Sequence, residues 1–139
     1  LIFIIMKLKT SKITGTDYAE VYKKAYNFYK TIKKNCRKRR THVRSKYFKN
    51  HKVFLELFWV HLHQKNIGER QRRVVFFPAA VEFILNSSEN PQMVALSSKS
   101  SEIFYRFRAE ASNGEVFFIQ IKEHKKSGQK WLMSIFPEK

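Results

Sequence analysis

Cysteine and aspartate are almost absent from this chain of 139 residues, and their scarcity excludes several kinds of site. Cys36 is the one cysteine and Asp17 the one aspartate. A single cysteine rules out a disulfide framework and a multi-cysteine zinc site. The 11 acidic residues do not gather into the carboxylate clusters that hold catalytic metal ions. His61 and His63 are two residues apart, and on a helix they point in different directions, which argues against a metal pair.

Long apolar runs are also missing. The longest candidate, Leu1–Met6, is much shorter than the roughly 20 residues that cross a bilayer, and no signal-peptide cleavage region follows it. Met6 is a candidate start of the chain. We therefore expect no membrane span and a cytoplasmic location. Neither a Gly-rich phosphate loop nor an assignable Ser–His–acid arrangement occurs, so no cofactor is expected.

Basic and aromatic residues are abundant. Lysine and arginine number 28, the formal net charge is +17, and 15% of residues are aromatic within an apolar share of 43%. This composition predicts one folded domain with a polyanionic partner, and nucleic acid is the first candidate. A ribosomal or simply basic protein and an anionic membrane surface are the alternatives.

The first part of the chain carries helical patterns around a basic segment. Apolar residues recur at helical spacing over Thr16–Lys34. Lys30–Lys52 holds 11 Lys and Arg and no acid, which is typical of a solvated loop, although Val43, Tyr47 and Phe48 indicate partial packing. The remaining predictions here are a helix over Val53–His63 capped by Gly68, a helix that begins at Pro78 with Leu85 turned inward, and a loop over Asn86–Ser101.

The last part of the chain alternates as β-strands do. Three strands are predicted, over Glu102–Glu110, Glu115–His124 and Lys130–Phe136, with turns at Asn113-Gly114 and Ser127-Gly128. The predicted fold class is therefore α+β, with N-terminal helices followed by a C-terminal antiparallel meander of three to four strands.

The register follows from the requirement that one face be apolar. A three-residue loop with Gly114 in the left-handed position aligns the apolar residues of the first two strands, and a similar loop at Ser127–Gln129 places the third, with Ser134 opposite Lys122. The predicted core face is Ile103, Tyr105, Phe107, Ala109, Phe117, Ile119, Ile121, Trp131, Met133 and Ile135. The predicted open face is Phe104, Arg106, Arg108, Phe118, Gln120, Lys122, His124, Leu132, Ser134 and Phe136.

The open face suggests a site for RNA. Arg106, Gln120, Lys122 and Ser134 form a polar cluster ringed by aromatic residues, although an ordinary solvated sheet face is the alternative. Cleavage of RNA without a metal ion needs only a base, an acid and cations, because the neighbouring 2′-hydroxyl attacks the phosphorus. These side-chain types are present.

Histidine is the expected proton carrier. His42 lies in the most basic stretch and is the first choice. Its neighbours Arg39, Arg40, Arg44 and Tyr47 are candidate nucleic-acid contacts, as are Arg108, Phe118, Gln120, His124 and Phe136 on the sheet. His51 and His124 are also candidate surface residues, whereas His61 on an apolar helix side is expected in the core.

The order of these patterns resembles one superfamily. The Pro-started helix Phe76–Ile84, the strand Phe117–Lys122 and the ending Leu132–Pro137 are similar to the barnase, EndoU, colicin and RelE-like (BECR) metal-independent ribonucleases, particularly their phage- and mobile-element-borne branches. The resemblance covers Thr41–Pro137. It divides the chain into an N-terminal helix and basic segment, 1–40, and a BECR-like α+β domain, 41–139.

The resemblance implies roles for four residues. Ser134 would position a phosphate, Arg106 and Lys122 would stabilise its developing charge, and His42 would transfer protons, with Lys122 as a second carrier. A toxin-like endoribonuclease acting in a bacterial cell is the leading hypothesis, with RNA as partner and an antitoxin or immunity protein as a further candidate partner. The alternatives are a non-catalytic RNA- or DNA-binding domain and a scaffold whose aromatic face another chain covers. The oligomeric state stays open.

Overall fold

The computed structural model describes residues 7–98 and 101–138, so the apolar segment Leu1–Met6 lies outside the described residues. The fold is α+β. The elements follow in the order α1 (Tyr18–Cys36), β1 (His42–Ser45), β2 (His51–Phe54), α2 (Glu56–His63), α3 (Ile67–Val74), α4 (Phe77–Asn86), β3 (Met93–Leu96), β4 (Glu102–Glu110), β5 (Val116–His124) and β6 (Lys130–Pro137).

Helix α1 forms close to its predicted bounds for local reasons. The Asp17 side chain accepts a hydrogen bond of 2.9 Å from the Glu20 N–H and so caps the first turn. The apolar residues at helical spacing bury Val21, Ala25 and Tyr29. The Tyr29 ring packs at 5.3 Å from the ring of Trp59 in α2, which joins the first helix to the rest of the core.

The basic segment is more ordered than the sequence predicted. It contains β1 and β2, an antiparallel hairpin that pairs Val43 with Val53 and buries both. Lys49 and Asn50 adopt positive φ in its turn. The predicted helix over Val53–His63 is wrong at its start, because its first two residues complete the hairpin and α2 begins only at Glu56.

Two further boundaries differ from the predictions. Gly68 does not cap α2, since it lies in the first turn of α3, whose N-cap is Asn66. Helix α4 has Pro78 in its first turn, as predicted, but Leu85 is exposed. The predicted loop over Asn86–Ser101 contains the short strand β3, because β4 offers it an unpaired edge.

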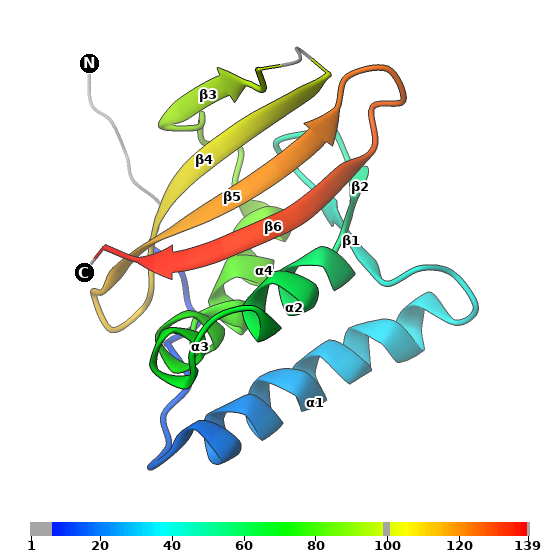
Figure 1. Cartoon of the computed structure of the whole chain (residues 1–139). Coiled ribbons are helices and arrows are strands. Elements are labelled where there is room, and N and C mark those ends of the chain that lie inside the picture. Colours follow the sequence, from blue (N-terminus) through cyan, green and yellow to red (C-terminus); the bar gives the residue numbers. More distant parts are fainter. Residues whose placement is uncertain (1–6, 99–100, 139) are drawn as a thin grey trace.

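The strands make one six-stranded sheet in the order β1-β2-β6-β5-β4-β3. The four C-terminal strands are the predicted meander, but β2 joins it by a short parallel contact with β6, so the sheet is mixed. In Figure 1, α4 lies behind the meander, α2 and α3 lie below β6, and α1 forms the outermost layer. None of the four described helices, α1–α4, crosses the face of β3–β6 that is turned to the viewer.

The first meander turn confirms its predicted register. Ala111 N–H donates to Glu115 O at 2.9 Å around a three-residue loop in which Gly114 has a φ of 90°. Phe107 consequently pairs with Ile119 and Arg106 with Gln120.

The second turn differs from the prediction. His124 N–H donates to Gln129 O at 2.8 Å, which closes a four-residue loop, and the register shifts again between Gln120 and Ile121. The shift leaves Met133 without a partner on β5, as in a β-bulge. The four-residue loop places Trp131 opposite Lys122 on the open face and leaves Leu132 fully buried, the reverse of the predicted sides. Ile135, Ser134 and Phe136 keep their predicted sides, but Ser134 lies opposite Gln120 rather than Lys122.

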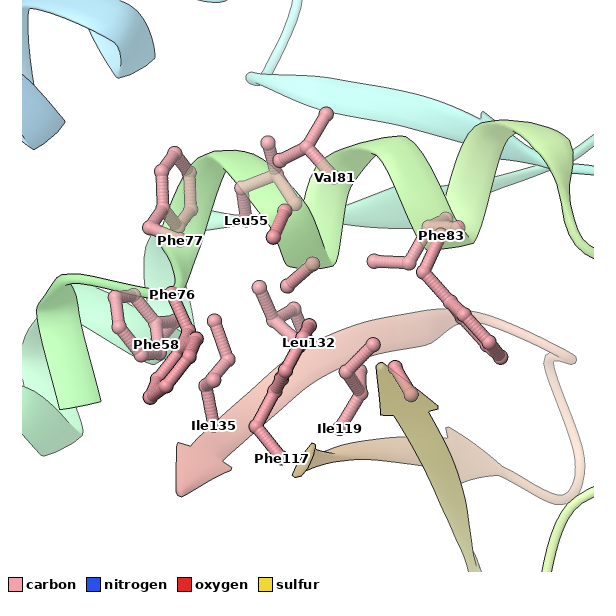
Figure 2. Packing of buried hydrophobic residues seen from close by; sticks show 14 of the residues in the cluster. Leu55, Phe58, Phe76, Phe77, Val81, Phe83, Phe117, Ile119, Leu132 and Ile135 are labelled. Carbon is pink, nitrogen blue, oxygen red and sulfur yellow. The ribbon is translucent and has the colours of Figure 1, made fainter. Parts of the chain in front are cut away.

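The main core lies between the sheet and α2–α4. Figure 2 shows Phe77, Val81 and Phe83 of α4 on one side and Phe117, Ile119, Leu132 and Ile135 of the strands on the other. The rings of Phe76 and Phe117 stack at 4.7 Å between their centres. This packing holds β5 and β6 rigidly and so positions their other face.

A polar cluster surrounds the buried Lys130 at one end of the core side. Lys130, 4% exposed, donates from Nζ to Gly128 O at 2.9 Å and to Nδ1 of His51 at 3.2 Å, and lies 3.8 Å from Oε2 of Glu123. The Tyr105 hydroxyl donates to Oε1 of Glu123 at 2.7 Å. Burial, followed by this contact with Glu123, raises the pKa of Tyr105 far above its usual value, so the phenol stays protonated as a donor.

Candidate nucleic-acid interface

The open face of the sheet is defined by the residues that alternate with the buried core residues of β4–β6. The central row runs across three strands, from Arg106 through Gln120 to Ser134. These three side chains are half-buried, whereas their core-side neighbours Phe107, Ile119 and Ile135 are buried. Because opposite residues on neighbouring strands lie about 5 Å apart, the row is a continuous polar strip.

A second arginine reaches this row from outside the sheet. Arg73, in the last turn of α3, donates from Nη1 to the Ser134 hydroxyl at 3.0 Å, and its Nε lies 3.4 Å from Glu69. Arg106 forms no ion pair with an acidic residue among residues 7–98 and 101–138, and its Nε is buried without a hydrogen-bond partner there. An arginine whose N–H groups are left unpaired is suited to an incoming anion.

Aromatic rings support the two arginines. The Phe118 and Phe136 rings stack at 5.4 Å with an interplanar angle of 29°. The Arg106 guanidinium lies 5.3 Å from the centre of the Phe136 ring, and that of Arg73 lies 5.7 Å away. This cation–π geometry places two positive charges around one half-buried ring. We call Arg73, Arg106, Gln120, Ser134 and Phe136 the arginine cluster.

Lys122 belongs to a different part of the same face. Its ammonium lies 3.2 Å from Oε2 of Glu102 and 5.2 Å from the centre of the Trp131 ring. Beyond Trp131, the face continues to Phe54 at 6.5 Å and from Phe54 to His42 at 6.2 Å between ring centres. The cation of Lys122 is thus already paired with a carboxylate.

The structure separates His42 from the other predicted catalytic residues. His42 lies three strand spacings from Lys122, or about 14 Å at 4.8 Å per spacing. The path between them runs through the pairings His42–Phe54, Phe54–Trp131 and Trp131–Lys122. His42 Nδ1 is 2.7 Å from Arg40 O, to which it donates. His42 is therefore not brought together with Lys122, and within the described residues it makes no contact with the arginine cluster.

Another histidine lies beside the cluster. His61 of α2 donates from Nδ1 to Met133 O at 3.2 Å, at the bulge of β6, because a carbonyl can only accept. In the neutral ring the other nitrogen, Nε2, then carries the lone pair that accepts a proton. His61, Lys65, Arg73 and Ser134 line one small cavity of about 10 Å³, roughly the space for a single water centre.

The other predicted contacts divide between the open face and elsewhere. Arg108, Phe118, Gln120, His124 and Phe136 lie on the open face by register, and Arg44 shares it with His42. Arg40 stacks on Phe54 at 4.2 Å and pairs with Glu56. Tyr47 lies on the opposite side, since its ring contacts the core residue Phe107 at 5.2 Å, and Arg39 lines a separate groove.

Sequence reasoning missed Arg73, His61 and Trp131 as members of this surface. Arg73 belongs to a basic helix whose placement depends on packing against β6, which no local pattern reveals. His61 was expected in the core, but the structure shows it only half-buried. The four-residue turn places Trp131 on the open face, and Ser127-Gly128 did not distinguish it from a three-residue turn.

Comparison with protein-family models, with curated proteins and with solved structures finds no match. Among residues 7–98 and 101–138, no three His, Cys, Asp or Glu side chains are placed to hold a metal ion. The helices in the same described part of the chain are all too short or too polar to span a bilayer. The function is therefore inferred from the chemistry of the open face.

Proposed function

We propose that the open face binds single-stranded RNA and that the chain is a metal-independent endoribonuclease. The observation that carries the proposal is the arginine cluster: Arg73 and Arg106 flank Ser134 and Phe136 on a sheet face that none of the helices α1–α4 covers. Two guanidinium groups bind a phosphate, and the Phe118–Phe136 pair offers a ring on which a base can stack.

The cleavage step follows from the groups at the edge of β6. Nε2 of His61 takes the proton of the 2′-hydroxyl, the 2′-oxygen attacks the phosphorus, and the 5′-oxygen leaves with a proton from Lys65 or water. Arg73 and Arg106 stabilise the extra negative charge of the pentacovalent phosphorus. The products are a 2′,3′-cyclic phosphate and a 5′-hydroxyl, and DNA is not cleaved because it lacks the nucleophile.

The experiment incubates the full chain with a single-stranded RNA oligonucleotide and with its DNA counterpart in excess EDTA. We expect RNA fragments that end in 2′,3′-cyclic phosphate and intact DNA. His61→Ala should lower the rate by about 10²–10⁴-fold, the usual contribution of acid–base catalysis. His63→Ala is the matched control on the same helix: its Nδ1 contacts Trp59 O at 2.7 Å, away from β6, and the rate should stay within twofold. His42→Ala tests the residue that the sequence favoured, and little change is expected.

A binding module without cleavage is the second candidate, and the Glu102 pairing of Lys122 favours it because this cation is not free to transfer a proton. In that case RNA stays intact, while Phe118→Ala weakens RNA binding by about 5–150-fold, the range of one lost stacked base. Intact RNA together with unchanged binding by Phe118→Ala would remove both candidates. A toxin-like role predicts growth arrest on expression of the wild type but not of His61→Ala.

A further inference from the structure

A second surface lies between α1, β1 and α4, on the far side of β1 from the rest of the sheet. It is a groove of about 1050 Å³. Its floor is apolar and includes Phe28, Ile32 and Leu85, of which Phe28 is 38% and Leu85 44% exposed. Exposed large apolar side chains that share one groove indicate a binding surface.

The groove is also basic. Arg37, Lys38, Arg39 and Arg44 contribute to its lining, and the lining contains no acidic residue. None of these four cations forms an ion pair with an acid in the part of the chain that the structure describes. An occupant with negative charges would therefore meet complementary cations at the rim.

One wall of the groove is the outer edge of β1, where the backbone groups of Arg44 form no backbone hydrogen bond within the described residues. The Leu55 N–H donates to Thr41 O at 3.1 Å, so the alternation of an antiparallel pair turns the backbone groups of His42 and Arg44 away from β2. Two contacts agree with this direction: Cys36 Sγ donates to His42 O at 3.4 Å, and Lys46 N–H donates to Ile84 O of α4 at 3.0 Å. The first contact occupies the His42 carbonyl, so the backbone groups of Arg44 are the ones open to an added strand. An edge strand with open backbone groups is a template for an added strand.

We propose that this groove binds an extended acidic segment of a partner protein, which adds to the sheet as a strand alongside β1. Successive side chains of an added strand point to opposite faces. Apolar side chains of the segment would contact Phe28, Ile32 and Leu85, and the alternate acidic ones would face Arg44 and the rim. The apolar floor and the strand edge together favour a peptide over RNA as the occupant, because RNA is recognised through its phosphates and stacked bases. This surface is separate from the arginine cluster, so the inference does not depend on the proposed function.

The test uses a fluorescein-labelled seven-residue peptide that alternates glutamate and valine, and fluorescence anisotropy of the full chain in 0.3 M salt. Two control peptides separate the contributions: an all-glutamate peptide retains only charge, and a form with N-methylated amides on the pairing side cannot extend the sheet. We expect the alternating peptide to bind at least about tenfold more tightly than either control, a difference of about 1.4 kcal/mol.

Variants of the chain localise the binding. Leu85→Lys and Arg39→Glu should each weaken it about tenfold. Val60→Lys changes an apolar residue that is 54% exposed on α2 outside the groove, Lys125→Glu changes an exposed lysine at the far turn, and both should leave binding within twofold. Equal binding of all three peptides, no binding at all, or equal effects of groove and control variants would overturn the proposal. A loss of RNA binding rather than of peptide binding in Leu85→Lys would also overturn the proposal, because it would assign the groove to nucleic acid.

Discussion

The buried contact between Lys130 and Glu123 allows a prediction that is independent of function. Glu123→Gln preserves the shape of the side chain and its acceptance from Tyr105, but it removes the only acidic group within 4 Å of the Lys130 ammonium in the described residues. Breaking a buried ion pair by removing one partner costs about 3–5 kcal/mol, because the other charge stays buried. Lys130 retains two acceptors, Gly128 O and His51 Nδ1, and the Glu123 side chain is 17% exposed. We therefore expect a loss of about 2–3 kcal/mol in the free energy of unfolding.

Urea unfolding followed by tryptophan fluorescence measures this loss. With a slope near 2 kcal/mol/M, the midpoint should fall by about 1–1.5 M. The double variant Lys130→Met with Glu123→Gln should be more stable than Glu123→Gln alone, because no buried charge is then left without a partner.

The exposed pair Lys12–Glu115 is the matched control. Its atoms are 2.6 Å apart, but the two side chains are 37% and 44% exposed. Glu115→Gln should change the free energy of unfolding by no more than about 1 kcal/mol. The account of the buried contact is wrong if Glu123→Gln and Glu115→Gln lower stability equally. It is also wrong if the stability loss of the double variant equals the sum of the losses of Lys130→Met and Glu123→Gln.

Three further predictions concern the surface, the first turn of α1 and the half-buried carboxylate of Glu82. Arg106→Ala should reduce the slope of log affinity for single-stranded RNA against log salt by about 0.7, the value for one lost phosphate contact, whereas Lys126→Ala at the exposed far turn should leave the slope unchanged. Asp17→Ala removes the cap of α1 and should lower the free energy of unfolding by about 1 kcal/mol, with Asp17→Asn retaining most of it. Burial raises the pKa of Glu82, but hydrogen bonds from the N–H groups of Lys9 and Thr10 outweigh burial and lower it overall. Because the pKa of Glu82 is lower in the folded state, this stabilisation is complete above pH 4.5 and is lost as the pH falls through the folded pKa. The measurement is an acid titration of stability. If Glu82→Gln shows the same pH dependence as the wild type, the prediction is contradicted.

The open face of the meander shows how far local pattern reaches. The alternation of β4 and β5 and a glycine with positive φ at Gly114 were enough to predict that Arg106 and Gln120 share the open face, where the structure pairs them. These features are local, because a hairpin register depends on a few turn residues and on the requirement for one apolar face. The same logic failed at the start of β6, where the longer turn changes the side on which Leu132 lies, and the unpaired Met133 then returns Ser134 to its predicted side.

The sequence by itself determined the α+β class, the excess of positive charge, the α1 helix and which side chains of β4 and β5 face away from the core. Tertiary structure alone decided that the basic segment becomes the β1–β2 hairpin, because its pairing with β6 joins residues far apart in the chain. It also decided that Arg73 and His61, rather than His42, lie beside Ser134. The physical reason is that helix packing against a sheet edge depends on the shape of the whole core, whereas alternation and turn chemistry act over a few residues.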